Sequence, residues 1–325
     1  MNEVKKNDLV SVIVTTHNRC TLMKRAVESI QKQSYTYLEI IIIDDNSSDD
    51  TEVYANELLK TDDRIRYIKI PQNESKGGNY ARNIGIENSR GEFIAFLDDD
   101  DVWHADKIQK QLEYLKKHSE LGAVSCEVRF VYDFGDKQYF DFSNTKLDKR
   151  PFGFFINSWL NTTSTIMARK AVLVNVGMFD LLMPALQECE LSYRICLNYK
   201  VEILKDVLVD YYIFPNISSQ ITSSMEKNQQ ALSRISCKYK NELNELLPDQ
   251  VEARVLTIKR GETLRYLRSG KKKEYRTVMR QIWKNTSKWE KMEYCLTYVL
   301  EYPQIIRLKC KLKGKRGKLN AVCDS

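Results

Sequence analysis

The amino-acid sequence predicts an α/β fold in which a mostly parallel sheet is flanked by helices. Three observations predict it: β-branched runs alternate with amphipathic segments over the first hundred residues, these runs are apolar almost throughout, and polar clusters stand directly after them. Continuous apolar strands are typical of a parallel sheet that helices cover on both faces. In such sheets ligands bind at the carboxyl ends of the strands. We therefore expect a ligand crevice at one end of the sheet.

The predicted elements follow one another at regular intervals. Apolar β-branched runs mark four strands, at residues 9–15, 38–43, 65–70 and 93–97. Apolar residues at helical spacing mark three helices between them, at residues 22–33, 50–59 and 79–88. Beyond these we expect a strand hairpin at residues 122–132 and 137–142. The aromatic segment 152–159 belongs either to the core or to a binding groove.

The rest of the chain reads as helical and basic. Beyond residue 215 helices are expected at residues 226–247, 251–267, 274–283 and 289–300. From Asp249 onward the chain has 20 Lys and Arg against 8 Asp and Glu, an excess of 12 positive charges within a total of +7, which leaves −5 for residues 1–248. Basic surfaces usually meet nucleic acid, anionic lipid or phosphorylated substrates. We predict a main domain over residues 1–220 and a basic helical extension over residues 221–325.

The sequence carries neither a membrane span nor a zinc-binding pattern. No stretch approaches the roughly 20 apolar residues that a span needs, and residues 1–8 lack the apolar core of a secretory signal. A cytoplasmic protein is therefore expected. The eight cysteines and three histidines show no metal-ligand spacing such as Cys-x-x-Cys, so the cysteines are expected to be reduced.

Polar clusters follow three of the predicted strands, at residues 15–19, 44–49 and 98–101. Asp and Ser after a strand often cap helices or form turns, and this interpretation is adopted for Ser48, Asp49 and Asp106. It does not explain four consecutive aspartates at 98–101, because their mutual repulsion costs free energy that a solvated turn does not require. A divalent cation offsets that repulsion, and hard oxygen ligands suit Mg²⁺ or Mn²⁺. The sequence therefore predicts a divalent-cation site here.

Three motifs, in this order and spacing, resemble those of the family 2 inverting glycosyltransferases of the GT-A fold: VSVIVTTHNR, IIIDDNSSDDT and GGNYARNIGIENSRGEFIAFLDDDDVWHADKIQKQ. The resemblance covers residues 9–215. It implies a GT-A sheet with a Rossmann-like nucleotide-binding half. It also implies transfer of a single hexose or N-acetylhexosamine from a nucleotide diphosphate donor, with a UDP-sugar expected, to a glycan acceptor that is expected to be lipid-linked.

The resemblance assigns roles position by position. The nucleotide pocket is lined by Thr15, His17 and Arg19, and Asp45 accepts a hydrogen bond from the base, typically uracil. Arg82 lies near the ribose and diphosphate. Asp100 is the direct metal ligand, and Asp98 lies nearer the ribose or sugar while belonging to the same Asp-x-Asp metal pair. Supporting roles are expected for Asp44 and Asn83, and weaker involvement for Asp99 and Asp101.

The resemblance also points to a catalytic base in the stretch QECELSYR, which follows GMFD. Direct displacement with inversion needs a general base to take the proton of the acceptor hydroxyl. Alignment of this stretch with the family's acidic pair makes Glu188 that base. This stretch departs from the family's pattern at two positions. Gln187 stands where an acid is more usual, and Glu188 stands where Asp is common. Glu188 and Glu190 can also be acids that favour a helix's first turn, and Glu190 is interpreted as structural.

Other function classes stay open. A nucleotidyltransferase also binds nucleotide and metal on an α/β sheet, but its usual Gly-rich basic loop after the first strand is missing. A catalytically inactive nucleotide-sugar binding module is favoured only by Gln187. The Gln-x-x-Arg-Trp motif and the membrane spans of processive synthases in the same family are not found, which favours single-sugar transfer.

The basic extension interleaves Lys and Arg with Trp and Tyr, a pattern of interfacial helices that meet anionic headgroups. We therefore expect peripheral attachment to the inner face of the cell membrane. The alternative is that these aromatics pack the helices together and the lysines are solvated. Nucleic acid is not expected as a partner, because no recognised reader motif accompanies the charge.

Overall fold

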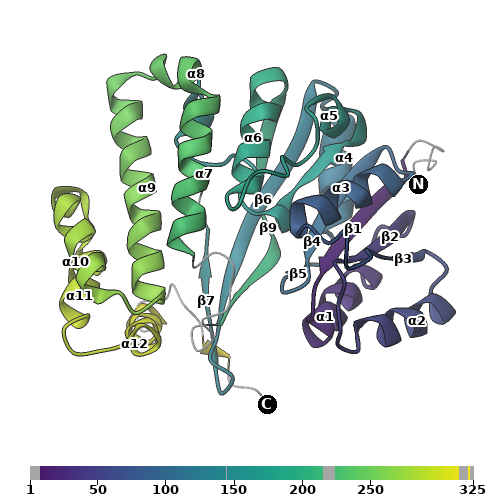
Figure 1. Ribbon diagram of the computed structural model, residues 1–325, viewed down its shortest axis with the longest axis horizontal. Helices are drawn as coiled ribbons and strands as arrows, with labels where there is room; N and C mark the ends of the chain where they lie inside the picture. Colours follow the sequence, from purple (N-terminus) through teal and green to yellow (C-terminus); the bar gives the residue numbers. More distant parts are fainter. Residues whose placement is uncertain (1–7, 144, 215–223, 315–320, 323–325) are drawn as a thin grey trace.

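The computed structural model describes residues 8–143, 145–214, 224–314 and 321–322 (Figure 1). Its centre is a mixed, mostly parallel sheet with the strand order β10-β7-β6-β8-β4-β1-β2-β3, in which β9 lies beside β6 and β5 beside β9. The strands are β1 (Val10–Thr16), β2 (Leu38–Asp44), β3 (Ile65–Lys69), β4 (Phe93–Asp98), β5 (Val102–Trp103), β6 (Leu121–Asp133), β7 (Gln138–Phe142), β8 (Met167–Arg169), β9 (Lys200–Ile213) and β10 (Ala321–Val322).

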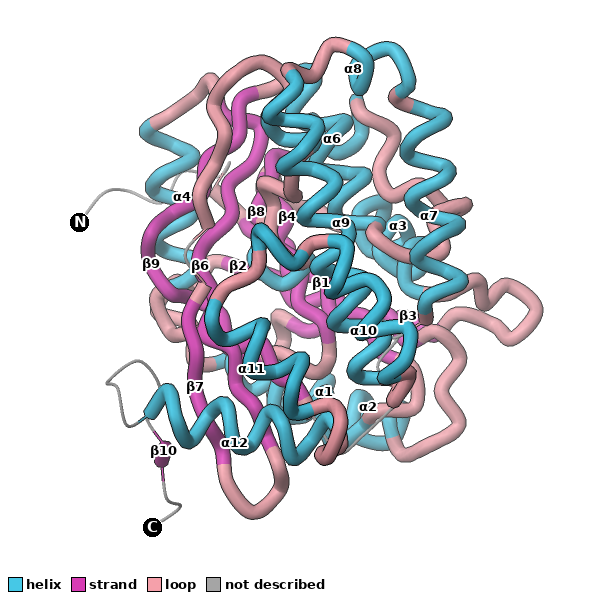
Figure 2. Tube along the Cα trace, turned by 90° about the vertical axis from the view of Figure 1, so that its left-hand side faces the viewer, coloured by secondary structure: helices cyan, strands magenta, loops and turns pink. Residues whose placement is uncertain are grey.

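Helices lie on both sides of this sheet (Figures 1 and 2). They are α1 (Cys20–Gln31), α2 (Thr51–Thr61), α3 (Gly78–Asn88), α4 (Lys107–Lys117), α5 (Lys170–Asn175), α6 (Gln187–Asn198), α7 (Met225–Lys238), α8 (Lys240–Asn244), α9 (Pro248–Arg268), α10 (Lys272–Gln281), α11 (Lys288–Leu296) and α12 (Tyr302–Gly314). The 3₁₀ turns η1 (Gly153–Phe155) and η2 (Thr163–Thr165) lie between β7 and β8, and η4 (Trp283–Asn285) lies between α10 and α11.

The first half of the chain confirms the predicted alternation. The four strands β1 to β4 and the helices α1 to α3 lie within a few residues of their predicted places, and β3, β2, β1 and β4 pair in parallel. Alternate residues of β1 pack in the two hydrophobic cores on opposite faces of the sheet. Val12 and Val14 belong to one core and Ile13 to the other. Because both faces are covered, the strands are apolar almost throughout. The predicted hairpin is β6 paired with β7.

The predicted single helix over residues 226–247 is wrong, since α7 ends at Lys238 and α8 begins at Lys240. The ring of Tyr239 between them is buried against Phe155 and Tyr193, with centroids 5.4 and 5.8 Å away. Its hydroxyl also donates to Glu190 at 2.7 Å. Tertiary packing of Tyr239 thus interrupts a pattern that is helical in the sequence.

The C-terminal helices pack on the β6–β7 hairpin. Phe134 and Tyr139 share a core with Ile305 and Ile306 of α12, which are buried. The alternative expectation, that aromatics of the extension pack its helices, holds for Tyr294, which packs against this core, but not for Tyr298, which is exposed. Phe154 and Phe155 of the aromatic segment are likewise core residues. The predicted boundary between residues 220 and 221 lies outside the described residues, so the domain division stays a prediction.

Two further expectations concern cysteines and membranes. Seven cysteines lie in the described part of the chain, and none of them forms a disulfide. Among the described residues, no helix combines the length and the apolar character that crossing a bilayer requires.

Candidate active site

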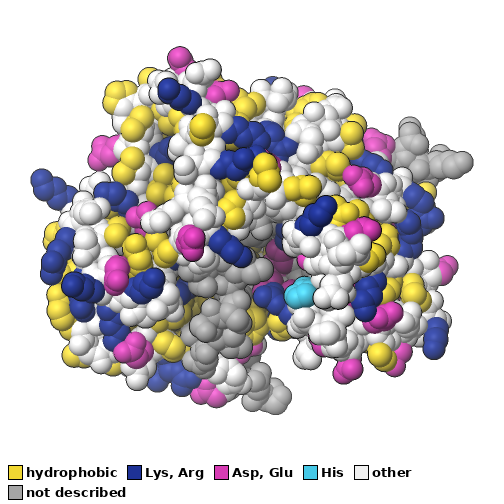
Figure 3. Space-filling model, viewed as in Figure 1, with side chains coloured by type: hydrophobic (Ala, Val, Ile, Leu, Met, Phe, Trp, Pro, Cys, Tyr) yellow, Lys and Arg dark blue, Asp and Glu magenta, His cyan; other side chains and the backbone are white. Residues whose placement is uncertain are grey.

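The carboxyl ends of β1, β2 and β4 lie together because these strands are adjacent and parallel. Thr15 at the end of β1 lies beside Ile43 on β2 and beside Asp98 on β4. Figure 3 shows that the surface is hollowed between the N-terminal half and the helical part, with acidic side chains in the hollow and Lys and Arg side chains around it. The polar segments predicted from the sequence therefore meet at one crevice.

Hydrogen bonds join the loop after β1 to the loop after β2. Nδ1 of His17 donates to the carbonyl oxygen of Asp45 at 2.7 Å. The backbone N–H of Asn18 donates to Oγ of Ser47 at 2.8 Å. His17 thus holds the backbone of Asp45, the residue predicted to bind the nucleotide base.

The residues expected to support these loops do so. Asp44 is buried and accepts hydrogen bonds from the backbone N–H of Ser47 at 2.7 Å and from the Tyr67 hydroxyl at 2.6 Å. Asp49 accepts from the backbone N–H groups of Cys20 and Thr51, at 2.9 and 3.1 Å. The bonds of Asp49 fix the start of α1 and of α2, and those of Asp44 fix the loop after β2.

The carboxylate of Asp45 has one oxygen in use and one without a partner. Oδ2 accepts from the backbone N–H of Gly77 at 3.0 Å, and Gly77 has a φ of 86°, a region that favours glycine. Oδ1 is buried and has no hydrogen-bond partner among the described residues. A buried acceptor left unpaired costs about 1–3 kcal/mol. Asp45 is therefore suited to accept a hydrogen bond from a ligand.

The four aspartates at residues 98–101 differ in accessibility. The side chains of Asp98 and Asp100 are 28% and 20% exposed, whereas that of Asp99 is 6% exposed. Asp101 is buried and accepts hydrogen bonds from Oγ of Ser164 at 2.6 Å and from a backbone N–H of β9. Asp98 and Asp100 are thus the two carboxylates that open most to the crevice.

Two arginines pair with this acidic cluster. Nη1 of Arg19 lies 3.1 Å from Oδ1 of Asp99 and 3.3 Å from Oδ2 of Asp100. Nη2 of Arg82 lies 2.6 Å from Oδ1 of Asp98, and its buried Nη1 has no partner in the part of the chain that the structure describes. Guanidinium groups bind phosphates through charge-assisted, often bidentate hydrogen bonds. Arg82 therefore has a donor available for a diphosphate beside Asp98.

Negative charge remains in excess at the cluster. Burial and repulsion from Asp99 and Asp98 raise the pKa of Asp100 to about 7. A divalent cation would relieve this repulsion, and Mg²⁺ is usually bound by one or two carboxylates together with substrate phosphates. No group of three or more His, Cys, Asp and Glu able to hold a metal occurs among the described residues. The accessible carboxylates of Asp98 and Asp100 can supply two oxygen ligands to such a cation, whose remaining ligands would have to come from outside these residues.

The segment before α6 is locked onto α3. Nδ2 of Asn83 donates to the carbonyl oxygen of Phe179, and the N–H of Phe179 donates back to Oδ1 of Asn83, both at 2.9 Å. Nδ2 of Asn79 donates to the carbonyl oxygens of Asp180 and Met183, each at 3.0 Å. Asn83 therefore has the supporting role expected of it, and α3 positions the start of α6.

Glu188 lies half-buried in the first turn of α6. The charges of Arg82, Asp98 and Arg265 act on its carboxyl group, so Glu188 lies near the Arg82–Asp98 pair. Burial raises the pKa of Glu188 above its ordinary value. A raised pKa suits a carboxylate that takes a proton near neutral pH. The structure thus brings the predicted base to the crevice.

Glu190 differs from Glu188 in every contact. Its side chain is fully buried and accepts hydrogen bonds from Nη2 of Arg194 at 2.7 Å, Nζ of Lys238 at 2.6 Å and the Tyr239 hydroxyl at 2.7 Å. These partners join α6 to α7. Glu190 therefore contributes to the fold, in agreement with its structural interpretation.

Sequence reasoning missed Arg25 and Tyr212. Nη2 of Arg25 donates to the backbone carbonyl of Asp100 at 2.9 Å, and its guanidinium lies 3.6 Å from the ring centre of Tyr212 on β9. Arg25 thus links the backbone of Asp100 to the ring of Tyr212. No motif marks either residue, because their pairing depends on β9, which was not predicted.

Unpaired polar atoms also mark the segment before β8. Oδ1 of Asn157, Nε1 of Trp159 and Oγ1 of Thr162 are buried without a hydrogen-bond partner among the described residues. Clustered orphan donors and acceptors are unusual in native proteins unless water or a ligand satisfies them. The only sequence signal was the aromatic and Thr-rich composition of residues 152–165.

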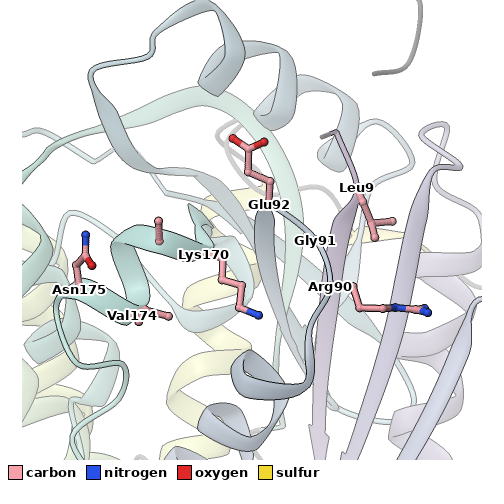
Figure 4. A pocket seen from close by; sticks show the side chains of 8 residues that line it. Leu9, Arg90, Gly91, Glu92, Lys170, Val174 and Asn175 are labelled. Carbon is pink, nitrogen blue, oxygen red and sulfur yellow. The ribbon is translucent and has the colours of Figure 1, made fainter. Parts of the chain in front are cut away.

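A second hollow lies at the opposite end of the sheet (Figure 4). This cavity of about 550 Å³ is lined by residues just before β1 and β4 and by residues of α5: Leu9, Arg90, Gly91, Glu92, Lys170, Ala171, Val174 and Asn175. Nζ of Lys170 already donates to the carbonyl oxygen of Ser89 at 2.7 Å. Because ligands of such sheets bind at the carboxyl ends of strands, this hollow is not the candidate active site.

Comparison with known proteins finds relatives in sequence and in fold. Residues 11–181 match the family model described as Glycosyl transferase family 2. The chain is 51% identical over 92 residues, 28% of its length, to GalNAc(5)-diNAcBac-PP-undecaprenol beta-1,3-glucosyltransferase of Campylobacter jejuni. It is 38% identical over 109 residues, 34% of its length, to UDP-Glc:alpha-D-GlcNAc-diphosphoundecaprenol beta-1,3-glucosyltransferase of Escherichia coli. The matches span 29% and 42% of these relatives, less than half of each.

Two solved structures share the fold over most of the chain. S. aureus TarS 1-349 in complex with UDP-GlcNAc has a TM-score of 0.54 at 15% identity, covering 86% of this chain and 93% of that one. Mannosyltransferase PcManGT from Pyrobaculum calidifontis, in complex with GDP-Man and Mn²⁺, has a TM-score of 0.56 at 14% identity, covering 94% and 87%. At such low identity these likenesses show the fold, which extends to the C-terminal helices.

Proposed function

The chain belongs to glycosyltransferase family 2, and we propose that it transfers a single hexose or N-acetylhexosamine from a UDP-sugar to a lipid-linked glycan, with inversion at the anomeric carbon. The observation that carries the proposal is the meeting of three groups at one crevice: the unpaired oxygen of Asp45, the accessible pair Asp98 and Asp100, and the half-buried Glu188. The donors and undecaprenol-linked acceptors named for the relatives support the substrate classes.

The donor's nucleotide is proposed to bind at the ends of β1 and β2. The unpaired Oδ1 of Asp45 accepts the N–H of the uracil base, while His17 holds the Asp45 backbone in place. Thr15 and Arg19 line the pocket beside it. Toward the diphosphate, the free Nη1 of Arg82 donates to a phosphate oxygen, and Asp98 lies near the ribose or sugar.

Asp100 and Asp98 are proposed to hold Mg²⁺ or Mn²⁺ together with the donor's diphosphate. Such a cation, when bound, stabilises the negative charge that grows on the leaving phosphate oxygens. Arg19 contacts both Asp99 and Asp100, so its bond to Asp99 would remain if Asp100 held the cation. The binding of Mn²⁺ by a structural neighbour supports this choice of cofactor.

Transfer itself needs one proton movement and one displacement. The carboxylate of Glu188 takes the proton of the acceptor hydroxyl, and the hydroxyl oxygen then forms a bond to the anomeric carbon. The bond between that carbon and the diphosphate oxygen breaks, and UDP leaves with its electron pair. Glu188 and the Asp98–Arg82 pair act on each other electrostatically, so base and leaving-group sites are neighbours, as direct displacement requires.

A donor panel tests the proposed activity. Release of UDP from UDP-sugars, and mass-spectrometric detection of a glycosylated acceptor, should occur with Mn²⁺ or Mg²⁺ present. Release of inorganic pyrophosphate from a sugar phosphate and UTP would instead show a nucleotidyltransferase. Tight UDP-sugar binding without turnover on any acceptor would show an inactive binding module.

Asp45→Ala should weaken UDP binding by about tenfold or more, because a buried hydrogen bond to the base is worth roughly 1–3 kcal/mol. The variant should also discriminate less between UDP and CDP or GDP. Calorimetric titration of each nucleotide measures both effects. Asp50→Ala is the matched control, since Asp50 is exposed in the same loop and its side chain makes no cap hydrogen bond. Unchanged nucleotide preference in Asp45→Ala would argue against the role.

Peripheral membrane attachment is proposed through α10, η4 and α11. Trp283, Tyr294 and Tyr298 form a ladder there, with ring centres 5.2 and 5.9 Å apart, and Tyr298 and the adjacent Val299 are 58% and 75% exposed. Cations surround the ladder: Arg276, Arg280, Lys284 and Lys291. Aromatic rings beside cations suit a headgroup region, where a lipid-linked acceptor would be found.

The vesicle test uses substitutions rather than truncation, because Ile305 and Ile306 belong to the core. The wild-type protein should sediment with anionic vesicles and be released by salt. Lys273→Glu combined with Lys284→Glu should reduce this binding about tenfold or more, since each cation near the surface contributes about 1 kcal/mol. Lys60→Glu combined with Lys117→Glu makes the same charge change on exposed sites of α2 and α4 and serves as control. Equal binding to neutral vesicles would refute the proposal.

A further inference from the structure

The second half of α9 runs past the start of α6. Near the other end of α9, buried Arg254 donates to the carbonyl oxygen of Phe155 and to the hydroxyl of Tyr193 on α6, the latter at 3.3 Å. Farther along α9, Arg265 and Glu188 act on each other electrostatically. Residue numbers thus rise along α9 while they fall along α6, so the two helices are antiparallel. This course brings Arg265 to the crevice beside Glu188.

Arg265 and Arg268 form no ion pair with any residue of the described part of the chain. The guanidinium of Arg265 folds back over Gly261, where an added Cβ would lie 2.8 Å from Nη1. It makes no hydrogen bond or ion pair with any residue that the structure describes. Nε of Arg268 donates to the Tyr302 hydroxyl at 3.3 Å, and no described carboxylate lies within ion-pair distance of it. By contrast, Arg260 on another side of α9 pairs with Glu290 at 3.1 Å.

The surroundings of Arg265 favour an anion from outside the chain. The charges that act on it are those of Arg268, Glu262 and Glu188, and burial together with Arg268 lowers its pKa. Two partly buried guanidinium groups one helical turn apart repel each other, and an anion that binds both relieves this repulsion. Phosphate groups meet the planar donor set of arginine bidentately. The pair is therefore positioned for a phosphorylated group.

We propose that Arg265 and Arg268 bind the diphosphate group of the lipid-linked acceptor. This inference rests on the proposed function, because it concerns the second substrate of that reaction. The donor's diphosphate is already assigned to Arg82 and to a cation at the carboxylates of the acidic cluster. Arg265 instead neighbours Glu188, which takes the proton of the acceptor. An acceptor sugar attached directly to the diphosphate brings its hydroxyl to Glu188 while its phosphates reach α9.

Two acceptors test the assignment. One is N-acetylglucosamine joined through a diphosphate to a short polyprenyl chain, and the other is the same sugar on an alkyl chain without phosphate. Arg265→Ala and Arg268→Ala should each raise the KM for the diphosphate acceptor about tenfold or more, because charge-assisted hydrogen bonds to phosphate are lost. The KM for the donor and for the phosphate-free acceptor should not change. Arg265→Lys should recover part of the loss, and Arg260→Ala is the matched control with no effect.

The results separate this inference from the proposed function. Equal effects on both acceptors, or a raised donor KM, would overturn the assignment. If no acceptor is glycosylated at all, calorimetry with inorganic pyrophosphate on the full chain saturated with UDP decides. Pyrophosphate binding that Arg265→Ala loses and Arg260→Ala keeps would support the anion site even though transfer fails. Absence of such binding, or equal binding in both variants, would refute it.

Discussion

Glu188→Gln should lower kcat by about 10²–10⁴-fold, the contribution typical of a positioned general base. Glutamine keeps the shape of the side chain in the first turn of α6 but cannot take the acceptor's proton. The dissociation constant of the UDP-sugar should change little, because the donor contacts are proposed for Asp45, Arg82 and the acidic cluster rather than for Glu188. Single-turnover kinetics with saturating donor, together with donor titration, measures both quantities.

The pH dependence of turnover adds a second measure of Glu188. The base must be ionised to accept a proton, so kcat at saturating donor and cation should rise with pH. Because burial raises the pKa of Glu188, this rise should lie at higher pH than for an ordinary glutamate. Near-normal turnover in Glu188→Gln would place the base elsewhere.

Glu190→Gln is the control two positions away. Glu190 is fully buried among Arg194, Lys238 and Tyr239. Its loss of charge should lower the free energy of unfolding by about 1–3 kcal/mol, because charged hydrogen bonds across α6 and α7 are weakened. Turnover per folded molecule should stay close to that of the wild type. A collapse of kcat in this variant would indicate that Glu190, and not only Glu188, takes part in catalysis.

The parallel half of the fold could be predicted because local pattern and tertiary environment agree there. Strands such as Leu38–Asp44 are buried on both faces, so an unbroken apolar run identifies them. Polar residues then stand where each strand ends, and parallel pairing forces Thr15 and Asp98 side by side. Both the sheet and the position of the crevice follow from this arrangement.

The remainder depends on contacts between distant segments, which periodicity does not report. The break at Tyr239 is set by rings from η1 and α6, and the long strand β9 pairs with β6 across a bulged register. The same holds within the acidic cluster. Four identical residues stand in sequence, yet Ser164 and β9 bury Asp101 while Asp98 and Asp100 open to the crevice. Arg265 stands 77 residues after Glu188 in the sequence (265 − 188), on a helix of the C-terminal part.

Asp100→Ala should lower kcat/KM for the donor by about 10²–10³-fold, the loss typical when one group that stabilises a developing oxyanion is removed. Asp100 is one of the two accessible carboxylates of the cluster, and its raised pKa reflects charge that a divalent cation would compensate. Arg19 keeps its partner Asp99 in the variant, so the crevice should stay folded. Donor titration with and without Mn²⁺ should show that the cation strengthens binding to the wild type but not to Asp100→Ala.

The control for this prediction is Asp106→Ala, which removes a carboxylate that is 47% exposed and pairs with Lys110 at the start of α4. It should retain both turnover and its dependence on Mn²⁺. Excess chelator should abolish wild-type turnover, and added Mn²⁺ or Mg²⁺ should restore it, because the leaving diphosphate needs its charge stabilised. Full wild-type activity in chelator, or Mn²⁺-dependent turnover surviving in Asp100→Ala, would show that the acidic cluster serves the donor without a metal ion at Asp100.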